Sequence, residues 1–220
     1  MTRRTTSVLA ASAVVLVSAP GVFAGDGKQQ IKLNKRDQAA ARVAVIRRTD
    51  LGSSGWQGGS VKPDLSSTPN CPQFHPKVSD LVVTGAAQTT FNRSGVEFGS
   101  VAEVLKTRRM VQLDWRRSVI PPAAVPCLRR TLANGLPASA RIVSFARIPF
   151  PHVGTRSARF RGVVRIDVLG RTARLVTDIV ITFRSRTEIT LNAAGPATAS
   201  GAISATEARL ARVLVSRVRA

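Results

Sequence analysis

The side chains best suited to chemistry are two cysteines and two histidines, namely Cys71, His75, Cys127 and His152. Thiolate and imidazole groups bind zinc, but the Cys-x3-His spacing of the first pair is not a common zinc pattern. A nucleophilic cysteine with a histidine base would need a free thiol. A disulfide between Cys71 and Cys127 is the favoured interpretation, and a zinc site or a nucleophilic Cys127 is the alternative. Such a bond would close a loop of about 57 residues and contribute about 4 kcal/mol.

Other catalytic and cofactor-binding patterns are missing from the sequence. Both histidines adjoin a proline, and no Gly-x-Ser-x-Gly motif is present. The carboxylates are few and include no closely spaced pair that suggests a general acid and base. The glycine-rich stretch Gly52 to Gly59 lacks the Gly-Lys-Ser/Thr ending of a phosphate-binding loop. We therefore expect a protein that is not an enzyme and that uses no cofactor and no metal.

Arginine supplies most of the formal net charge of +21. Along residues 158–168 apolar and basic residues alternate with the period of a half-buried strand. The candidate face for an anionic partner consists of Arg159, Arg161, Arg165, Arg174 and Arg184. An anionic cell-wall polymer or a lipid-like ligand would fit this face, and a simply solvated sheet surface is the alternative. Nucleic acid is not expected, because no aromatic residues are interleaved with the basic ones.

The first 24 residues have the layout of a secretory signal peptide. Arg3 and Arg4 precede an apolar run from Val8 to Val17, and Ala24 suits cleavage before Gly25. An uncleaved membrane anchor is the alternative, since Thr5 to Ala24 approaches the roughly 20 residues that span a bilayer. We expect a signal peptide at 1–24, a secreted protein or one on the extracellular face of the cell envelope, and membrane contact only before cleavage.

The rest of the chain, 25–220, is expected to form a single domain. With 44% hydrophobic and 20% charged residues, a chain of 220 residues can build a substantial core. The expected helices are 35–48, 101–119 and 123–135, together with a C-terminal helix that begins at a capping box formed by Ser204 and Glu207. The expected strands of the first two thirds are 81–84, 89–98 and 140–150. Residues 51–80 are rich in Gly, Ser and Pro and are expected to form one long loop.

Residues 156–192 predict an antiparallel meander. If Gly170-Arg171 forms the first turn, Leu169 pairs with Thr172 and Phe160 faces Ile181. A three-residue loop at 184–186 would then set Ile189 and Leu191 beside Ile181 and Ile179. The predicted fold class is α+β, with a curved antiparallel sheet packed against N-terminal, central and C-terminal helices and one disulfide.

The order of these elements resembles a group of exported bacterial domains. The carriers of the resemblance are the tryptophan-bearing loop, the segment Asp114-Trp115-Arg116-Arg117, Pro126-Cys127-Leu128, the meander and the final helix. The chain is similar to the extracellular sensor domains of bacterial receptor serine/threonine kinases and to related cell-wall proteins of high-GC Gram-positive bacteria. This resemblance implies a groove or cavity and ligand binding without catalysis. Those domains typically have two disulfides, so no functional residue is transferred to this chain.

Two functions follow from these observations. The first is an exported, non-enzymatic binding or sensor-like domain of the cell envelope for an amphipathic or anionic ligand. The second is a structural or protein-interaction module that its arginine-rich surface holds at the anionic cell wall. Salt separates the two, because attachment by surface charge is screened at a few hundred millimolar salt whereas binding in an apolar cleft persists.

Overall fold

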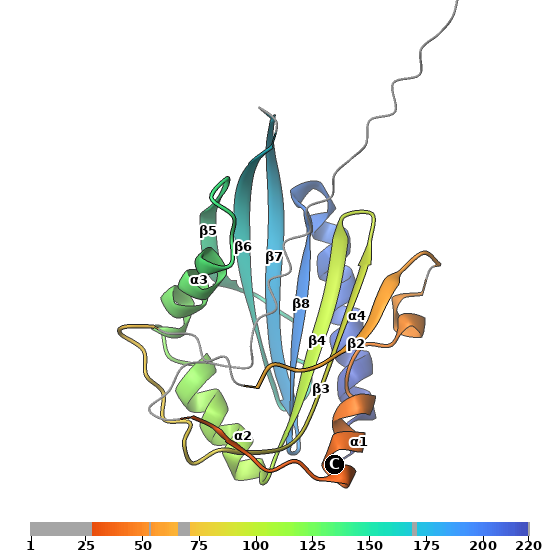
Figure 1. Cartoon of the computed structure of the whole chain (residues 1–220), viewed down its shortest axis with the longest axis vertical. Helices are drawn as coiled ribbons and strands as arrows, with labels where there is room; N and C mark the ends of the chain where they lie inside the picture. Colours follow the sequence, from red (N-terminus) through yellow and green to blue (C-terminus); the bar gives the residue numbers. More distant parts are fainter. Residues whose placement is uncertain (1–27, 53, 66–70, 169–170, 220) are drawn as a thin grey trace, which may run out of the picture.

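One mixed β-sheet organises the computed structural model, which describes residues 28–52, 54–65, 71–168 and 171–219 (Figure 1). Within these residues eight strands form the sheet, in the order β1-β3-β4-β8-β7-β6-β5, with β2 also paired to β3. The strands are β1 (Gln30–Ile31), β2 (Gln57–Val61), β3 (Val82–Arg93), β4 (Val96–Leu105), β5 (Ala140–Ile148), β6 (Arg156–Val168), β7 (Arg171–Arg184) and β8 (Thr187–Pro196). The expected α+β fold is confirmed, and the predicted signal peptide at 1–24 lies outside the described residues.

Helices cover both faces of this sheet. They are α1 (Lys35–Val43), α2 (Arg108–Asp114), the π-helical turn η2 (Trp115–Val119), α3 (Ala124–Asn134) and α4 (Ser200–Arg217), with 3-10 turns at Arg48–Leu51 and Ala197–Ala199. In Figure 1, α2 and α3 lie on the left and α1 and α4 on the right. Because side chains alternate along a strand, β7 contributes to two cores. Val176 and Val180 pack with α1 and α4, whereas Ile179 and Ile181 pack with α2, η2 and α3.

The register of β6 and β7 differs from the prediction by two residues. Val168 lies opposite Arg171, so Phe160 faces Ile179 and not Ile181. Leu169 and Gly170, on which the predicted turn depended, lie outside the described residues. A shift of two keeps every side chain on its predicted face, which is why the apolar pattern alone could not distinguish the two registers.

The predicted register of β7 and β8 is wrong by one residue, with a larger consequence. Ile189 lies opposite Thr182 and Leu191 opposite Val180, because β7 ends at Arg184 and only Ser185 and Arg186 form the turn. A one-residue shift moves every side chain to the other face. Ile189 and Leu191 therefore pack under α1 and α4, away from Ile181.

The predicted helix at 101–119 is wrong in its first turn and a half. Residues 101–105 belong to β4, which pairs with β3 on one side and β8 on the other, and these ladders override helical propensity. The strands expected at 81–84 and 89–98 become the continuous β3 and the start of β4. Helix α2 begins after Thr107, whose hydroxyl accepts a hydrogen bond from the Met110 amide at 3.2 Å.

The stretch at 51–80, predicted to be one irregular loop, contains β2. Trp56, just before this strand, is buried against Phe98, and the Arg93 guanidinium lies 4.9 Å from its ring centre. Farther along, Cys71 forms the predicted disulfide with Cys127 in α3. This bond attaches the second half of the 51–80 stretch to α3, in the helical layer over β6 and β7.

The predicted capping box of the last helix is wrong. Helix α4 starts at Ser200, so Ser204 and Glu207 lie inside it. The Ser204 hydroxyl donates to the Ser200 carbonyl at 2.8 Å, and the Glu207 side chain is fully buried against the sheet. The Glu207 carboxyl group contacts the guanidinium of Arg159 in β6.

Candidate functional site

The five arginines of the predicted anionic-partner face do lie on one face of β6 and β7, but α4 covers part of that face. Arg159 is only 6% exposed. Its guanidinium lies 2.6 Å from the Asp178 carboxylate and 2.8 Å from that of Glu207 in α4. Arg161, directly opposite Asp178 in the register, donates to both oxygens of the same carboxylate. These two arginines neutralise buried acids and do not form an open surface.

The remaining three arginines of that face are in different surroundings. Arg184 donates to the Val215 carbonyl at the end of α4, and Arg165 pairs with Asp167 at 3.2 Å. Arg174 is exposed. The predicted face therefore comprises a buried ion network, two half-buried arginines with one partner each (Arg165 and Arg184) and the exposed Arg174. Strand alternation indicated which side chains share a face, but it could not show that a helix packs on that face.

The cysteines and histidines do not converge on a metal. Cys71 and Cys127 are joined in the disulfide, and His75 contacts the Pro72 carbonyl at 3.1 Å through Nε2. His152 is exposed beside Pro151. Among the described residues no group of three or more His, Cys, Asp or Glu side chains could hold a metal ion.

Three buried carboxyl groups gather where α2 packs on the sheet, and the sequence pattern did not indicate them. Glu103 in β4 lies opposite Glu188 in β8, and Asp114 of α2 is close enough to both to affect their ionisation. Burial, with the charge of Asp114, raises the pKa of Glu103 to about 7 and raises that of Glu188 well above its usual range. Burial raises the pKa of Asp114 to about 6, against a hydrogen bond from Ser118. The two large grooves described below do not include these groups in their walls.

A groove opens at the other end of the sheet, where β3 has two partners along one edge. The short β1 pairs with Val82 and Val83, and β2 pairs with residues 88–92. Along this edge no described strand lies beside residues 84–87, between the two ladders. On the other side residues 85–87 pair with β4, after a bulge at Thr84. Asn34 donates to the Thr84 carbonyl at 2.9 Å, and the Gln38 side chain accepts from the Ala86 amide at 2.8 Å. We call the resulting hollow the β3 groove.

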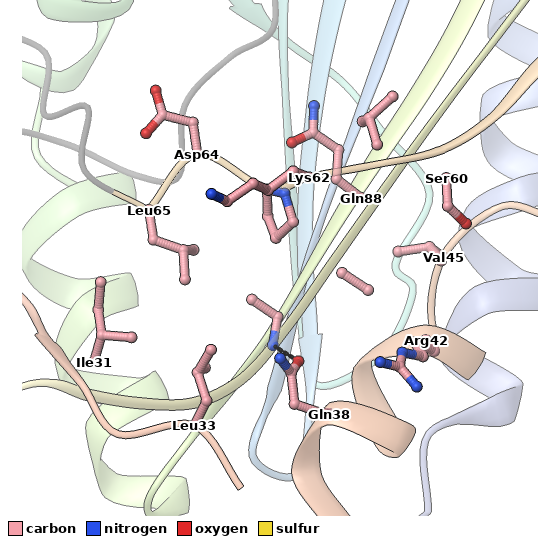
Figure 2. Close-up of a pocket in the computed structure, with 14 residues that line it drawn as sticks. Ile31, Leu33, Gln38, Arg42, Val45, Ser60, Lys62, Asp64, Leu65 and Gln88 are labelled. Atoms are coloured by element: carbon pink, nitrogen blue, oxygen red, sulfur yellow. Dashed lines mark hydrogen bonds between the residues drawn. The ribbon is translucent and has the colours of Figure 1, made fainter. Parts of the chain in front are cut away.

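The β3 groove has a volume of about 830 Å³, within the range of ligand-binding pockets. Its walls come from the β1 segment, α1, β3, and β2 with the residues that follow it. Apolar side chains on it are unusually open to solvent, with Ile31 46%, Leu33 45% and Val61 43% exposed. Figure 2 shows Ile31, Leu33 and Leu65 pointing toward one another across the hollow. Charged groups also line it: Arg42, Lys62 and Asp64.

An ion pair fixes the helical wall of this groove. Arg186, in the turn between β7 and β8, donates to both carboxylate oxygens of Asp37 at 2.7 and 3.1 Å. The hydrogen bonds and charge of Arg186 hold the pKa of Asp37 well below its usual range, in spite of burial. Since Gln38 follows Asp37 and Arg42 lies one helical turn beyond Gln38, the same contacts place Arg42 at the groove, as Figure 2 shows.

The sequence pattern did not indicate this groove. Its walls depend on β1 and β2 both adding to β3, which is not a local property of any segment. One local signal existed, since Ile31 and Leu33 alternate with the polar residues Gln30, Lys32 and Asn34. This alternation indicates an extended segment with one apolar face.

Solved structures similar to this chain include two from mycobacteria. The X-ray structure of the Rv0999 ortholog from Mycobacterium smegmatis shares 13% identity with a TM-score of 0.46, covering 84% of this chain and 98% of that chain. LpqN, involved in cell envelope biogenesis of Mycobacterium tuberculosis, shares 11% identity with a TM-score of 0.32, covering 72% and 89%. At these TM-scores neither likeness supports an inference about function, and neither protein is described as a kinase sensor domain. No protein-family model and no curated protein matches the sequence.

Among the described helices, none is both long enough and apolar enough to cross a membrane.

Proposed function

We propose that this protein is a non-enzymatic binding domain that holds an amphipathic anion in the β3 groove and acts outside the cytoplasm. The observation that carries the proposal is the set of exposed apolar side chains around a hollow with cations at its wall. Large apolar side chains gathered on a concave surface typically mark a binding site. Ile31, Leu33 and Leu65 would contact the apolar chain of the ligand.

The basic side chains favour an anionic head group. Arg42 from α1 and Lys62 after β2 are both exposed and stand on two different walls of the groove. Together they outnumber the single carboxylate, Asp64, on the same rim. An ammonium or guanidinium group binds a phosphate or carboxylate by charge-assisted hydrogen bonds. The groove thus matches a ligand with one apolar and one negative end.

Export fits the same proposal. The predicted signal peptide would direct the chain across the membrane, and the Cys71–Cys127 disulfide is of the kind that persists in an oxidising compartment. A ligand with an apolar chain has low solubility outside the cell. A groove that covers the chain would let the protein carry or sense such a molecule.

Titration calorimetry with dodecyl phosphate below its micelle concentration tests the proposal. We expect one molecule to bind per chain, and inorganic phosphate and dodecyltrimethylammonium not to compete for the site. Leu33→Ser should weaken binding about fivefold, since about 1 kcal/mol of apolar burial is lost. Val143→Ser, which changes an equally exposed apolar residue on β5, should leave the affinity unchanged.

The head-group contact has its own matched pair of variants on α1. Arg42→Ala should weaken dodecyl phosphate binding, whereas Arg36→Ala, which removes an exposed arginine that does not line the groove, should not. If dodecyl phosphate does not bind, or if Leu33→Ser and Val143→Ser behave alike, the groove is not the binding site. The interaction-module function would then be favoured.

A further inference from the structure

A second surface on the opposite helical layer carries a strong positive charge. From Lys106 to Arg147 the sequence has nine basic residues and one acid, Asp114. The Asp114 side chain is 3% exposed and is buried near the carboxyl groups of Glu103 and Glu188. The outer side of α2, η2 and α3 therefore shows arginines without a nearby exposed carboxylate from the same segment.

Five of these arginines are exposed, and we call them the helical basic surface: Arg108, Arg109, Arg116, Arg129 and Arg130. The apolar side chains of these elements, such as Val111 in α2, Trp115 in η2 and Leu128 in α3, pack in the core against the sheet, so the exposed arginines lie on the outer side. None of the five forms an ion pair with a described residue. Arg117, by contrast, is held by Asp80 at 2.7 Å and is not included.

The disulfide shapes a hollow in this surface. Because Cys71 is bonded to Cys127, the segment 71–74 is held beside α3, and a groove of about 620 Å³ lies between them. Arg129 and Arg130 line this groove with the polar side chains of Gln73 and Asn134. We call it the disulfide groove. Arg129 and Arg130 are adjacent in sequence, and both are exposed on the side of α3 away from the core.

We propose that the helical basic surface binds a linear polyanion with phosphate or carboxylate groups along its chain, one segment of which lies in the disulfide groove. Charge complementarity favours this occupant, since unpaired cations on two successive helical elements match charges repeated along a polymer. This surface lies on α2, η2 and α3 and is distinct from the predicted arginine face on β6 and β7. It is separate from the β3 groove and shares no residue with it.

Two other classes of macromolecule fit less well. A helix that lies in a membrane surface needs an outward apolar face, whereas the apolar faces of α2 and α3 are buried and only Ile120 is strongly exposed between them. Single-stranded nucleic acid is bound by stacking on aromatic side chains, but Trp115 and Phe74 are buried.

The test is binding of fluorescently labelled polyphosphate, and of poly-L-glutamate, to the full chain by anisotropy at several salt concentrations. We expect a salt-dependent Kd, and for the double variant Arg129→Glu/Arg130→Glu a loss of at least about tenfold. The slope of log Kd against log salt concentration should fall by about 1 to 1.5. Inorganic phosphate at equal charge should compete poorly.

A second double variant guards against misfolding. Arg108→Glu/Arg109→Glu places acids in the first turn of α2, where the helix dipole favours them, and should weaken polymer binding without lowering Tm. The matched control Arg171→Glu/Arg174→Glu makes the same change in net charge at exposed positions of β7 and should cost much less. An equal loss in the control would overturn the proposal. It would also be overturned if vesicles of phosphatidylcholine and phosphatidylglycerol bind while neither polymer does.

Discussion

The guanidinium of Arg159 in β6 lies 2.8 Å from the carboxylate of Glu207 in α4, and both side chains are buried. Asp178 completes the cluster by pairing with Arg159 and Arg161. Burial and the charge of Asp178 raise the pKa of Glu207 to about 8, against the effect of Arg159. The raised pKa disfavours the charged form of Glu207, so α4 is held on the sheet by its buried leucines together with the contact between Glu207 and Arg159.

Removing the shared carboxylate should be costly. Asp178→Ala leaves two arginines in or near the core without their partner, and loss of one member of a buried pair typically costs 3–5 kcal/mol. Asp167→Ala breaks the exposed pair with Arg165 on the same hairpin and should shift the unfolding midpoint far less, because solvent screens that pair. Urea unfolding of both variants measures the difference. Equal shifts of the two midpoints would contradict the buried network.

The three buried carboxyl groups near α2, those of Glu103, Glu188 and Asp114, predict that the stability of the fold falls as pH rises. The folded pKa of Glu103, about 7, is above its ordinary value of 4.5, so the folded state holds a proton that the unfolded chain releases in this interval. The free energy of unfolding should therefore decrease between about pH 4.5 and 7, on the order of 3 kcal/mol for Glu103 alone. Glu188, whose pKa is also raised, extends the decrease to higher pH. Thermal melts across this range measure it.

The double variant Glu103→Gln/Glu188→Gln provides the control for that effect. It keeps the shape of the side chains and removes two titrating groups, so its stability should change less with pH and exceed that of the wild type at pH 8. Below about pH 4 both proteins should lose stability, because Asp37 and Asp80 have lowered pKa values and lose their arginine pairs on protonation. An unchanged slope between pH 5 and 8 in the double variant would exclude this origin.

The disulfide should stabilise the fold by about 4 kcal/mol, since its partners are 56 residues apart. Cys71→Ser and Cys127→Ser should lower stability to a similar degree, and the double variant should be no worse than either. Reduction of the wild-type protein should bring its unfolding midpoint to that of the variants. A much larger effect of one single variant would show that its cysteine has a role besides the bond.

Local pattern predicted which side chains share a face of β6, but not what covers that face. The alternation around Phe160 placed this residue on one face and Arg159 on the other, and the structure confirms it because a period of two is a property of the strand itself. The partner of Arg159 could not be predicted. Ser204-x-x-Glu207 fits a helix start as well as a helix interior, and only tertiary packing shows that Glu207 faces the sheet.

The candidate site was harder to predict from the sequence than the strands were, because it also depends on tertiary packing. The disulfide followed from compartment and cysteine count, whereas the β3 groove arises where β1, β2 and α1 meet β3. These segments are up to about 60 residues apart in the chain. Exposure of Ile31 and Leu33 is visible only once the gap between the two ladders is known.

Gly85 is where the groove can be tested through its backbone. A Cβ atom at this position would collide with the backbone of Asp37 and Gln38 in α1, so the absence of a side chain lets the helix lie against β3. Gly85→Ala should push α1 away, lower stability by about 1–3 kcal/mol and weaken dodecyl phosphate binding. Gly99→Ala adds the same methyl group to β4, where its nearest neighbour would be 3.5 Å away, and should change neither quantity appreciably. If Gly85→Ala loses stability but binds dodecyl phosphate with the wild-type affinity, the α1 wall does not contribute to the site. The apolar contacts of Leu33 and Leu65 would then have to account for the binding.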